Sequence, residues 1–298
     1  MSAGEKFTPD RERFPFRSRW LTLKNGATIH YVDEGEGPVL LLLHGNPTWS
    51  FLYRNIIAGL RDRFRCIAPD YPGFGLSTAP AGYGFTAAEQ AAAMAEFIGM
   101  LDPGMMTIMM QDWGGPVGFA LALRQPERVR GFIIGNTWAW PLERRGQKMF
   151  SRIMGGPVGR GIAWCCNGIV HVFMSRGIAT SLDDRVLAMY LAPFRKRKSR
   201  RPTHIFPRQL LWAGPFLADI HSRLPALADK PALILWGMKD FAFQEPERTR
   251  FEALFCDHET VLLPNAGHFI QEDAPEAIVA AIRGYFERRA PGDASRLS

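Results

Sequence analysis

Long apolar runs are missing from this sequence of 298 residues. The longest, such as Val39–Leu43 and Ala232–Trp236, have the length of a buried strand. They fall far short of the roughly 20 residues that a membrane-spanning helix needs. The segment Met1–Arg19 is polar and charged, without the apolar stretch of a secretory signal peptide. We therefore expect a cytoplasmic protein with no membrane partner.

Cysteine is also scarce, with four residues in the whole chain: Cys66, Cys165, Cys166 and Cys256. Their spacing matches neither a zinc site nor a CxxC redox pair. Cys165 and Cys166 are adjacent, and adjacent cysteines rarely bridge. We expect four free thiols that are buried or partly buried.

Positive charge is in excess, with a net charge of +7, and part of it is local. Arg195–Arg201 reads RKRKSRR, six basic residues in seven. Such a run can bind nucleic acid or acidic lipid. Because neither interleaved aromatic residues nor a nucleic-acid module accompanies it, we interpret it as a solvated loop and expect no nucleic-acid partner. A specific polyanion site is the alternative.

Strand-like runs alternate with helical segments on both sides of a long middle stretch. Strands are predicted at Trp20–Leu23, Thr28–Asp33, Val39–Leu43, Arg65–Pro69, Met105–Gln111, Val129–Asn136, Ala232–Trp236 and His258–Leu263. The first two, joined by an Asn-Gly turn, are expected to form an antiparallel pair. The alternation of the others with helices predicts a mostly parallel α/β sheet with helices on both faces.

The middle stretch, Pro141–Asp229, has almost no strand-like runs. We interpret it as a helical insertion over the carboxyl ends of the strands, where such sheets place their sites. The predicted organisation is a core formed by residues 1–140 and 229–298, with a helical cap over residues 141–228, called the helical insertion below.

A nucleophile elbow is predicted at residues 111–115, QDWGG, between a strand and a helix. Such a turn exposes one side chain, here Asp112, and Gly114 lets the helix lie close. A carboxylate at this position argues against serine-esterase chemistry. Met110 departs from the first glycine of the G-x-S-x-G pattern. The alternative interpretation is that Asp112 only caps the helix.

Two further residues complete a nucleophile–acid–base order along the chain. His268 follows the last strand in the segment NAGH, and Asp240 follows the preceding strand in WGMKD. A carboxylate at Asp240 can orient the imidazole and stabilise its protonated form. Each position is weak evidence alone, but with Asp112 they predict a catalytic triad on an α/β-hydrolase fold.

Hydrogen-bond donors are predicted beside the nucleophile. The segment HGNP, residues 44–47, ends the central strand, so the backbone N–H groups of Asn46 and Trp113 can form an oxyanion hole. The Asn46 amide and the Trp113 indole also carry N–H donors. Two such donors converging beside a carboxylate suit a leaving halide.

At this point the chain resembles the haloalkane dehalogenases. The resemblance rests on His44–Arg54 (HGNPTWSFLYR), Asp70–Ser77 (DYPGFGLS), Gln111–Gly115 (QDWGG), the WGMKD segment, Gly267–Pro275 (GHFIQEDAP) and FPRQ at residues 206–209. With Asp240 as the acid, Asn136 where one subfamily has a glutamate, and Asn46 and Trp113 as the halide pair, it resembles the third subfamily. Glu143 is a fallback acid.

The resemblance implies a two-step hydrolysis without metal or organic cofactor. Asp112 displaces halide from an apolar haloalkane and becomes an alkyl ester. His268, oriented by Asp240, then activates the water that hydrolyses the ester. Trp138, Phe206 and Pro207 are expected in the substrate pocket. Chain-length preference, physiological substrate and oligomeric state are left open.

Four other interpretations compete with this one. Epoxide hydrolases share the Asp elbow but use two lid tyrosines, and the insertion contains only Tyr190. The β-lactone decarboxylases of olefin biosynthesis resemble the third subfamily, and cofactor-free luciferase-like oxygenases also resemble dehalogenases. A catalytically inactive protein that binds a small ligand is the remaining alternative.

Overall fold

An eight-stranded sheet crosses the molecule in the order β1-β2-β4-β3-β5-β6-β7-β8. The computed structural model describes residues 7–289, so the outermost parts of the predicted core, 1–6 and 290–298, lie outside the described residues. The strands are β1 (Arg19–Thr22), β2 (Thr28–Glu34), β3 (Val39–Leu43), β4 (Arg65–Pro69), β5 (Met106–Asp112), β6 (Val129–Thr137), β7 (Ala232–Gly237) and β8 (His258–Leu263). Pairing is antiparallel for β1–β2 and β2–β4 and parallel elsewhere. The predicted α/β sheet is confirmed, with each strand end within one residue of its predicted place.

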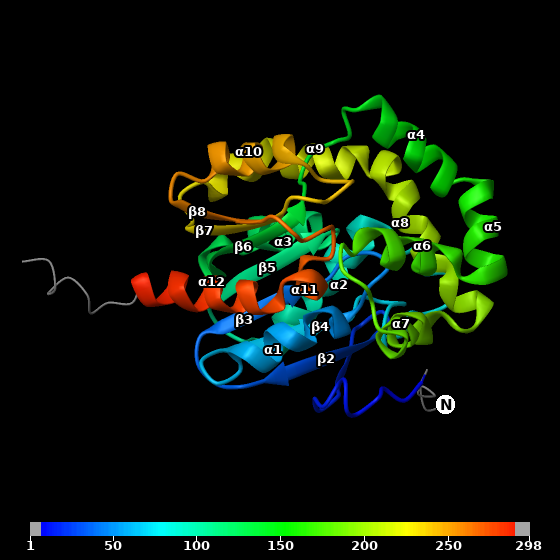
Figure 1. Ribbon diagram of the computed structural model, residues 1–298, viewed down its shortest axis with the longest axis horizontal. Coiled ribbons are helices and arrows are strands. Elements are labelled where there is room, and N and C mark those ends of the chain that lie inside the picture. The colour runs from blue at the N-terminus through cyan, green and yellow to red at the C-terminus, as the bar shows by residue number, and fades with distance from the viewer. Residues whose placement is uncertain (1–6, 290–298) are drawn as a thin grey trace, which may run out of the picture.

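Helices cover both faces of the sheet. Figure 1 shows α1 (Arg54–Leu60) and α12 (Pro275–Arg288) in front of it, and α2 (Ala87–Leu101) and α3 (Gly114–Arg124) behind it. The helix α10 (Glu245–Leu254) packs against β6 and β7, and the short helix α11 (Ile270–Asp273) precedes α12. Because its two faces are both covered, the central strands β3 and β5 are buried along their whole length.

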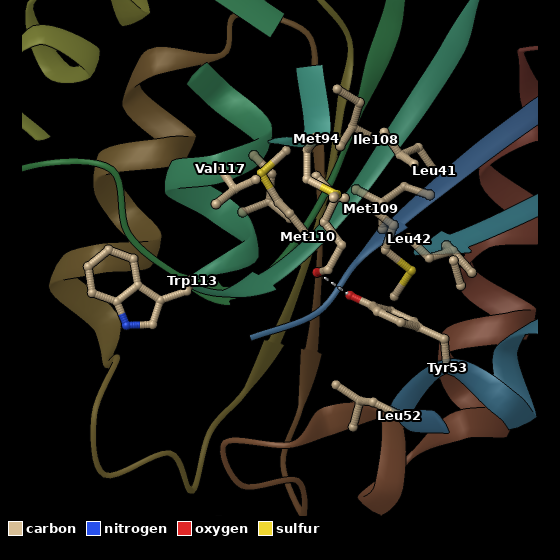
Figure 2. Packing of buried hydrophobic residues seen from close by; sticks show 14 of the residues in the cluster. Leu41, Leu42, Leu52, Tyr53, Met94, Ile108, Met109, Met110, Trp113 and Val117 are labelled. Atoms are coloured by element: carbon tan, nitrogen blue, oxygen red, sulfur yellow. Dashed lines mark hydrogen bonds between the residues drawn. The ribbon is translucent and has the colours of Figure 1, made fainter. Parts of the chain in front are cut away.

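The apolar core lies between β3, β5 and the helices behind them. Figure 2 shows this packing with residues from four elements, Leu41 and Leu42 of β3, Ile108, Met109 and Met110 of β5, Met94 of α2 and Val117 of α3. The hydroxyl of Tyr53 donates a hydrogen bond to the carbonyl of Leu43 (2.8 Å), at the end of β3. Trp113, one residue after β5, belongs to the same buried cluster but lies apart from these side chains in Figure 2.

The helical insertion contains α4 (Arg145–Met154), α5 (Pro157–Cys166), α6 (Gly168–Gly177), α7 (Asp184–Leu191), α8 (Arg201–Trp212) and α9 (Gly214–Arg223). Figure 1 shows α4 to α8 gathered to one side of the sheet. The last helix, α9, returns to the core and packs against α3. The last helix of the insertion is therefore packed as part of the core, whereas α4 to α8 lie to one side of the sheet.

Two expectations about the surface can be compared with the structure. No helix within residues 7–289 is long and apolar enough to cross a bilayer. All four cysteines are free, as expected, but only Cys66 is buried. The expectation that the thiols are buried or partly buried is wrong for Cys165, Cys166 and Cys256. Cys165 and Cys166 end α5, an apolar helix that lies at the outer edge of the molecule (Figure 1).

Candidate active site

Asp112 occupies a sharp bend between β5 and α3. Its φ of +49° lies in the left-handed region, which costs a residue other than glycine about 1–3 kcal/mol and persists only where the surroundings enforce it. A side chain at Gly45 would collide with the Asp112 side chain, and one at Gly114 would collide with the Leu43 carbonyl. Thr137 donates a hydrogen bond to the Asp112 carbonyl (2.5 Å). The close packing of β3 and β6 around the bend thus holds the carboxylate beyond the end of the sheet.

Two backbone N–H groups converge on the Asp112 carboxylate. The N–H of Asn46 donates to Oδ2 at 2.7 Å, and the N–H of Trp113 also donates to the carboxylate. Burial raises the pKa of Asp112, while His268 and these two donors partly oppose that rise. The resting nucleophile therefore already occupies the place in which an oxyanion would be stabilised.

His268 lies across the site from Asp112 and is held by Asp240. Its Nδ1 is 3.0 Å from Asp240 Oδ2, and its Nε2 is 3.9 Å from Asp112 Oδ1. Burial lowers the pKa of His268, but the negative charges of Asp240 and Asp112 outweigh that effect and raise it above the ordinary value. The structure thus brings together three side chains from the ends of β5, β7 and β8.

Asn136, at the end of β6, supports the acid. Its Nδ2 donates to Asp240 Oδ2 (2.9 Å), and its Oδ1 accepts from the N–H of Gly237 (2.7 Å). The N–H of Ala242 donates to the other oxygen of Asp240 (2.7 Å). The sequence interpretation treated Asn136 only as the replacement of a glutamate. Its place at the end of the strand next to β7 is the signal that could have indicated this contact.

Gln111 is a second residue that the sequence interpretation did not assign. Its Nε2 lies 3.1 Å from His268 Nε2 and donates to the His268 carbonyl (3.0 Å). Gln111 thus fixes the loop that carries the imidazole to the strand that carries the carboxylate.

The Asn46 and Trp113 side chains both line the cavity beside Asp112. One amide N–H of Asn46 donates to the carbonyl of Thr203 in α8 (3.3 Å), which leaves a second donor. No residue within 7–289 accepts a hydrogen bond from the Trp113 indole. Trp138 and Phe206 pack edge-on against that indole, with ring centroids 4.7 and 5.1 Å away. They lie behind Trp113 rather than in the cavity wall, whereas Pro207 is part of the wall.

The cavity has a volume of about 430 Å³ and a mostly apolar wall. The other wall residues from the helical insertion are Leu142, Arg144, Gly146, Gln147, Phe150, Phe173 and Leu210. The loop between β7 and α10 adds Phe241, Ala242 and Phe243. Among residues 7–289, no three His, Cys, Asp or Glu side chains gather as metal ligands. An ionised carboxylate and an imidazole at the end of an apolar chamber suit nucleophilic attack on an apolar electrophile.

Two residues considered from the sequence lie elsewhere. Glu143, the fallback acid, is exposed and forms an ion pair with Arg250 (2.9 Å). Tyr190 is buried, and its hydroxyl donates to Glu272. Neither residue lines the cavity. The imidazole therefore has Asp240 as its carboxylate partner, and the tyrosine of the insertion is engaged away from the nucleophile.

Known proteins resemble this chain, and the relatives named here match it over most of its length. A model of the alpha/beta hydrolase fold family matches residues 38–151. Haloalkane dehalogenase 2 of Mycobacterium tuberculosis is 48% identical over 278 residues, 93% of this chain and 97% of that protein. A cis-3-alkyl-4-alkyloxetan-2-one decarboxylase of Xanthomonas campestris is 31% identical over 304 residues, 96% and 98% of the two chains. A crystal structure of a haloalkane dehalogenase from Bradyrhizobium elkani superposes with a TM-score of 0.84 at 28% identity and covers 92% and 98%.

Replacing Asn136 tests its support of Asp240. Asn136→Ala leaves the Gly237 N–H without its buried acceptor and Asp240 with one donor fewer. We expect the free energy of unfolding to fall by about 1–3 kcal/mol. Chemical denaturation measures it, with Asn265→Ala, an exposed asparagine, as the matched control. Equal stability of Asn136→Ala and the wild type would contradict the role given to these bonds.

Proposed function

The chain belongs to the haloalkane dehalogenase family and is a hydrolase of carbon–halide bonds, and we propose that it acts through an alkyl ester on Asp112. The observation that carries the proposal is a buried carboxylate at an apolar cavity, with His268 Nε2 3.9 Å from its Oδ1 and the Trp113 indole beside it. The proposed substrate is a small apolar haloalkane, and the products are an alcohol, a halide ion and a proton.

The first step is displacement of halide by Asp112. Oδ2 is held by the N–H of Asn46, so Oδ1 attacks the carbon that bears the halogen. A carbon–oxygen bond forms as the carbon–halogen bond breaks, and the halide leaves with the electron pair. The Trp113 indole and the free amide N–H of Asn46 stabilise that growing charge. Burial removes water from the carboxylate, so the nucleophile is little solvated.

The second step is hydrolysis of the ester. His268 Nε2 takes a proton from a water molecule that attacks the ester carbon, and Asp240 stabilises the imidazolium. The N–H groups of Asn46 and Trp113 stabilise the oxyanion on Oδ2. The bond from the ester carbon to the alkoxy oxygen then breaks, the alkoxide takes the proton from His268, and the second proton of the water is released. Asp112 returns as a carboxylate.

The helical insertion is the proposed cap of this chamber. Its helices α4, α6 and α8 contribute Phe150, Phe173 and Pro207 to the wall. We propose residues 141–228 as the cap and the flanking segments as the core, although α9 packs with the core. The exposed free thiols suit a reducing compartment, which supports the cytoplasm as the location.

Two observations favour dehalogenation over the alternatives: the sequence identity to the relatives and the position of the Tyr190 hydroxyl. The identity is 48% to the dehalogenase and 31% to the decarboxylase, which by its name acts on a β-lactone. Epoxide hydrolysis requires a hydroxyl aimed at the epoxide oxygen, but the Tyr190 hydroxyl is bound to Glu272. Binding of a small ligand without catalysis does not require Asp112, His268 and Asp240 to lie in reacting geometry.

Removal of the nucleophile should abolish turnover. We expect the wild type to release halide from a panel of bromo- and iodoalkanes and Asp112→Ala to release none, because no other carboxylate among residues 7–289 lines the cavity. A cis-β-lactone tested in parallel reports carbon dioxide. Carbon dioxide from the lactone with no halide from any haloalkane would replace dehalogenation by decarboxylation.

Removal of the base should separate the two steps. In His268→Ala the carboxylate can still attack, but no group activates water, so the alkyl ester should accumulate. Intact-protein mass spectrometry after exposure to a bromoalkane should show the added mass of one alkyl group, which peptide mapping assigns to Asp112. If His268→Ala remained unmodified while the wild type released halide, the covalent scheme would be wrong.

The pH dependence of ester hydrolysis should report the raised pKa of His268. Only the neutral imidazole accepts a proton, so hydrolysis is fast above that pKa and is lost as the pH falls through it. In the alkyl-enzyme Asp112 is an uncharged ester, so Asp240 is the carboxylate that still raises the pKa of His268 against its burial. Asp240→Asn removes that charge, so the fall in the rate of ester hydrolysis should move to lower pH. Single-turnover rates of ester hydrolysis across neutral pH measure this dependence. If the rate fell at the same pH in Asp240→Asn as in the wild type, Asp240 would not be the residue that raises the pKa of the base.

A further inference from the structure

Exposed apolar side chains are concentrated on the helical insertion. Of the twelve large apolar residues that are exposed within residues 7–289, six lie in it: Met149, Ile153, Val158, Trp164, Val172 and Trp212. Val158 and Trp212 are 60% and 66% exposed. Scattered single residues of this kind need no explanation, but a group on one surface marks a binding site.

Helices α4 and α5 present these side chains along continuous stripes. Met149 and Ile153 are four residues apart on α4, and Val158 and Cys165 are about two turns apart on one side of α5. Cys165 is exposed, and so is Trp164 next to it. Figure 1 shows α4 and α5 at the edge of the molecule that is farthest from the sheet strands β7 and β8. The stripes therefore face outward from the insertion.

Positive charge is concentrated on the same segment. Residues 141–228 contain fifteen of the 36 Lys and Arg residues but only four of the 29 acidic ones. The insertion thus carries a net charge of +11 and the rest of the chain −4. From Arg144 to Leu182 there is no acidic residue at all. The excess charge of the protein belongs to the insertion alone.

Basic and aromatic side chains share two neighbouring grooves on this surface. Arg160, His204, Arg208 and Trp164 line both grooves, whose volumes are about 670 and 790 Å³, and none of the described residues that line them is acidic. The Arg208 guanidinium lies over the exposed Trp212 ring, 3.7 Å from its centroid. Such a surface combines positive charge with apolar contact area.

The basic run Arg195–Arg201 is fixed beside Trp164 rather than free. The side chain of Arg200 turns inward and donates to the carbonyls of Trp164 (2.7 Å) and Phe194 (2.8 Å). The neighbouring side chains of residues 195–198 are exposed. Arg200 therefore anchors four solvent-facing cations next to the apolar stripe of α5.

We propose that this outer face binds the surface of an anionic phospholipid bilayer. We define the face by its apolar members Met149, Ile153, Val158, Trp164 and Trp212 and by its basic members Arg152, Arg160, Arg195, Lys196, Arg197, Lys198 and Arg208. Apolar side chains beside Lys and Arg are the composition of interfacial helices, and tryptophan favours the headgroup level. The same charge disfavours a symmetric pairing of two copies through this face, because like charges would meet.

The location of the face suggests how apolar substrate reaches the cavity, an extension that rests on the proposed function. The helix α4 carries Met149 and Ile153 outward, while its Gln147 and Phe150 line the cavity. Haloalkanes partition into bilayers, so a cap that lies on the membrane would meet its substrate there. This proposal departs from the expectation of no membrane partner, because the sequence did not reveal which apolar side chains of the insertion are exposed.

Vesicle sedimentation tests the proposal directly. The full chain is mixed with vesicles of phosphatidylcholine alone or of equal parts phosphatidylcholine and phosphatidylglycerol, at low and high salt. We expect binding to the anionic vesicles only, weakened by salt. The double substitution Val158→Ser with Trp164→Ser should lower the partition coefficient at least about tenfold, since both side chains lose apolar burial. Arg195→Glu with Arg197→Glu should remove the preference for anionic lipid.

Trp20→Ser is the matched control, because Trp20 is 50% exposed but lies on the edge strand β1. It should bind vesicles as the wild type does. Absence of binding to anionic vesicles, or an equal loss in Trp20→Ser, would overturn the proposal. So would an oligomer in lipid-free solution that Val158→Ser with Trp164→Ser converts to a monomer, measured by light scattering. Halide release from a water-soluble bromoalkane should be unchanged in all these variants, so a failure here is distinct from a failure of the proposed reaction.

Discussion

Asp112 combines two unfavourable conditions, burial of a carboxylate and a backbone φ of +49°. Both can persist only because neighbouring backbone is packed against the bend, at Gly45 on one side and Gly114 on the other. The N–H groups of Asn46 and Trp113 then compensate part of the lost hydration. The buried charge in turn raises the pKa of His268, so the base depends on the nucleophile as well as on Asp240.

The parallel sheet is what brings these groups to one place. β3, β5, β7 and β8 end at the same edge: Asp112 is the last residue of β5, and Asn46, Asp240 and His268 follow the other three strands. Asn136 at the end of β6 connects the acid to the strand between nucleophile and acid. The insertion closes the chamber over this edge, and its contribution is apolar except for Arg144 and Gln147.

The sequence predicted the centre of the sheet well because strands such as β3 and β7 are buried on both faces and consist of unbroken apolar runs. It also predicted which residues lie together at the sheet edge, since parallel strands end there. It did not indicate which aromatic residues line the cavity. Trp138 and Phe206 were expected in the wall but pack behind Trp113, because helix packing in the insertion decides which side of a ring faces the cavity. The contacts of Gln111 and Asn136, and the exposure of α5, likewise depend on tertiary packing that no local pattern records.

The origin of the alcohol oxygen tests the central claim most directly. A single turnover with enzyme in excess over haloalkane, in water labelled with heavy oxygen, distinguishes attack by Asp112 from direct attack by water. If Asp112 is alkylated, the first alcohol carries unlabelled oxygen from the carboxylate, and mass spectrometry finds the label in the Asp112 side chain. Labelled alcohol in that first turnover, with an unlabelled Asp112, would contradict the account.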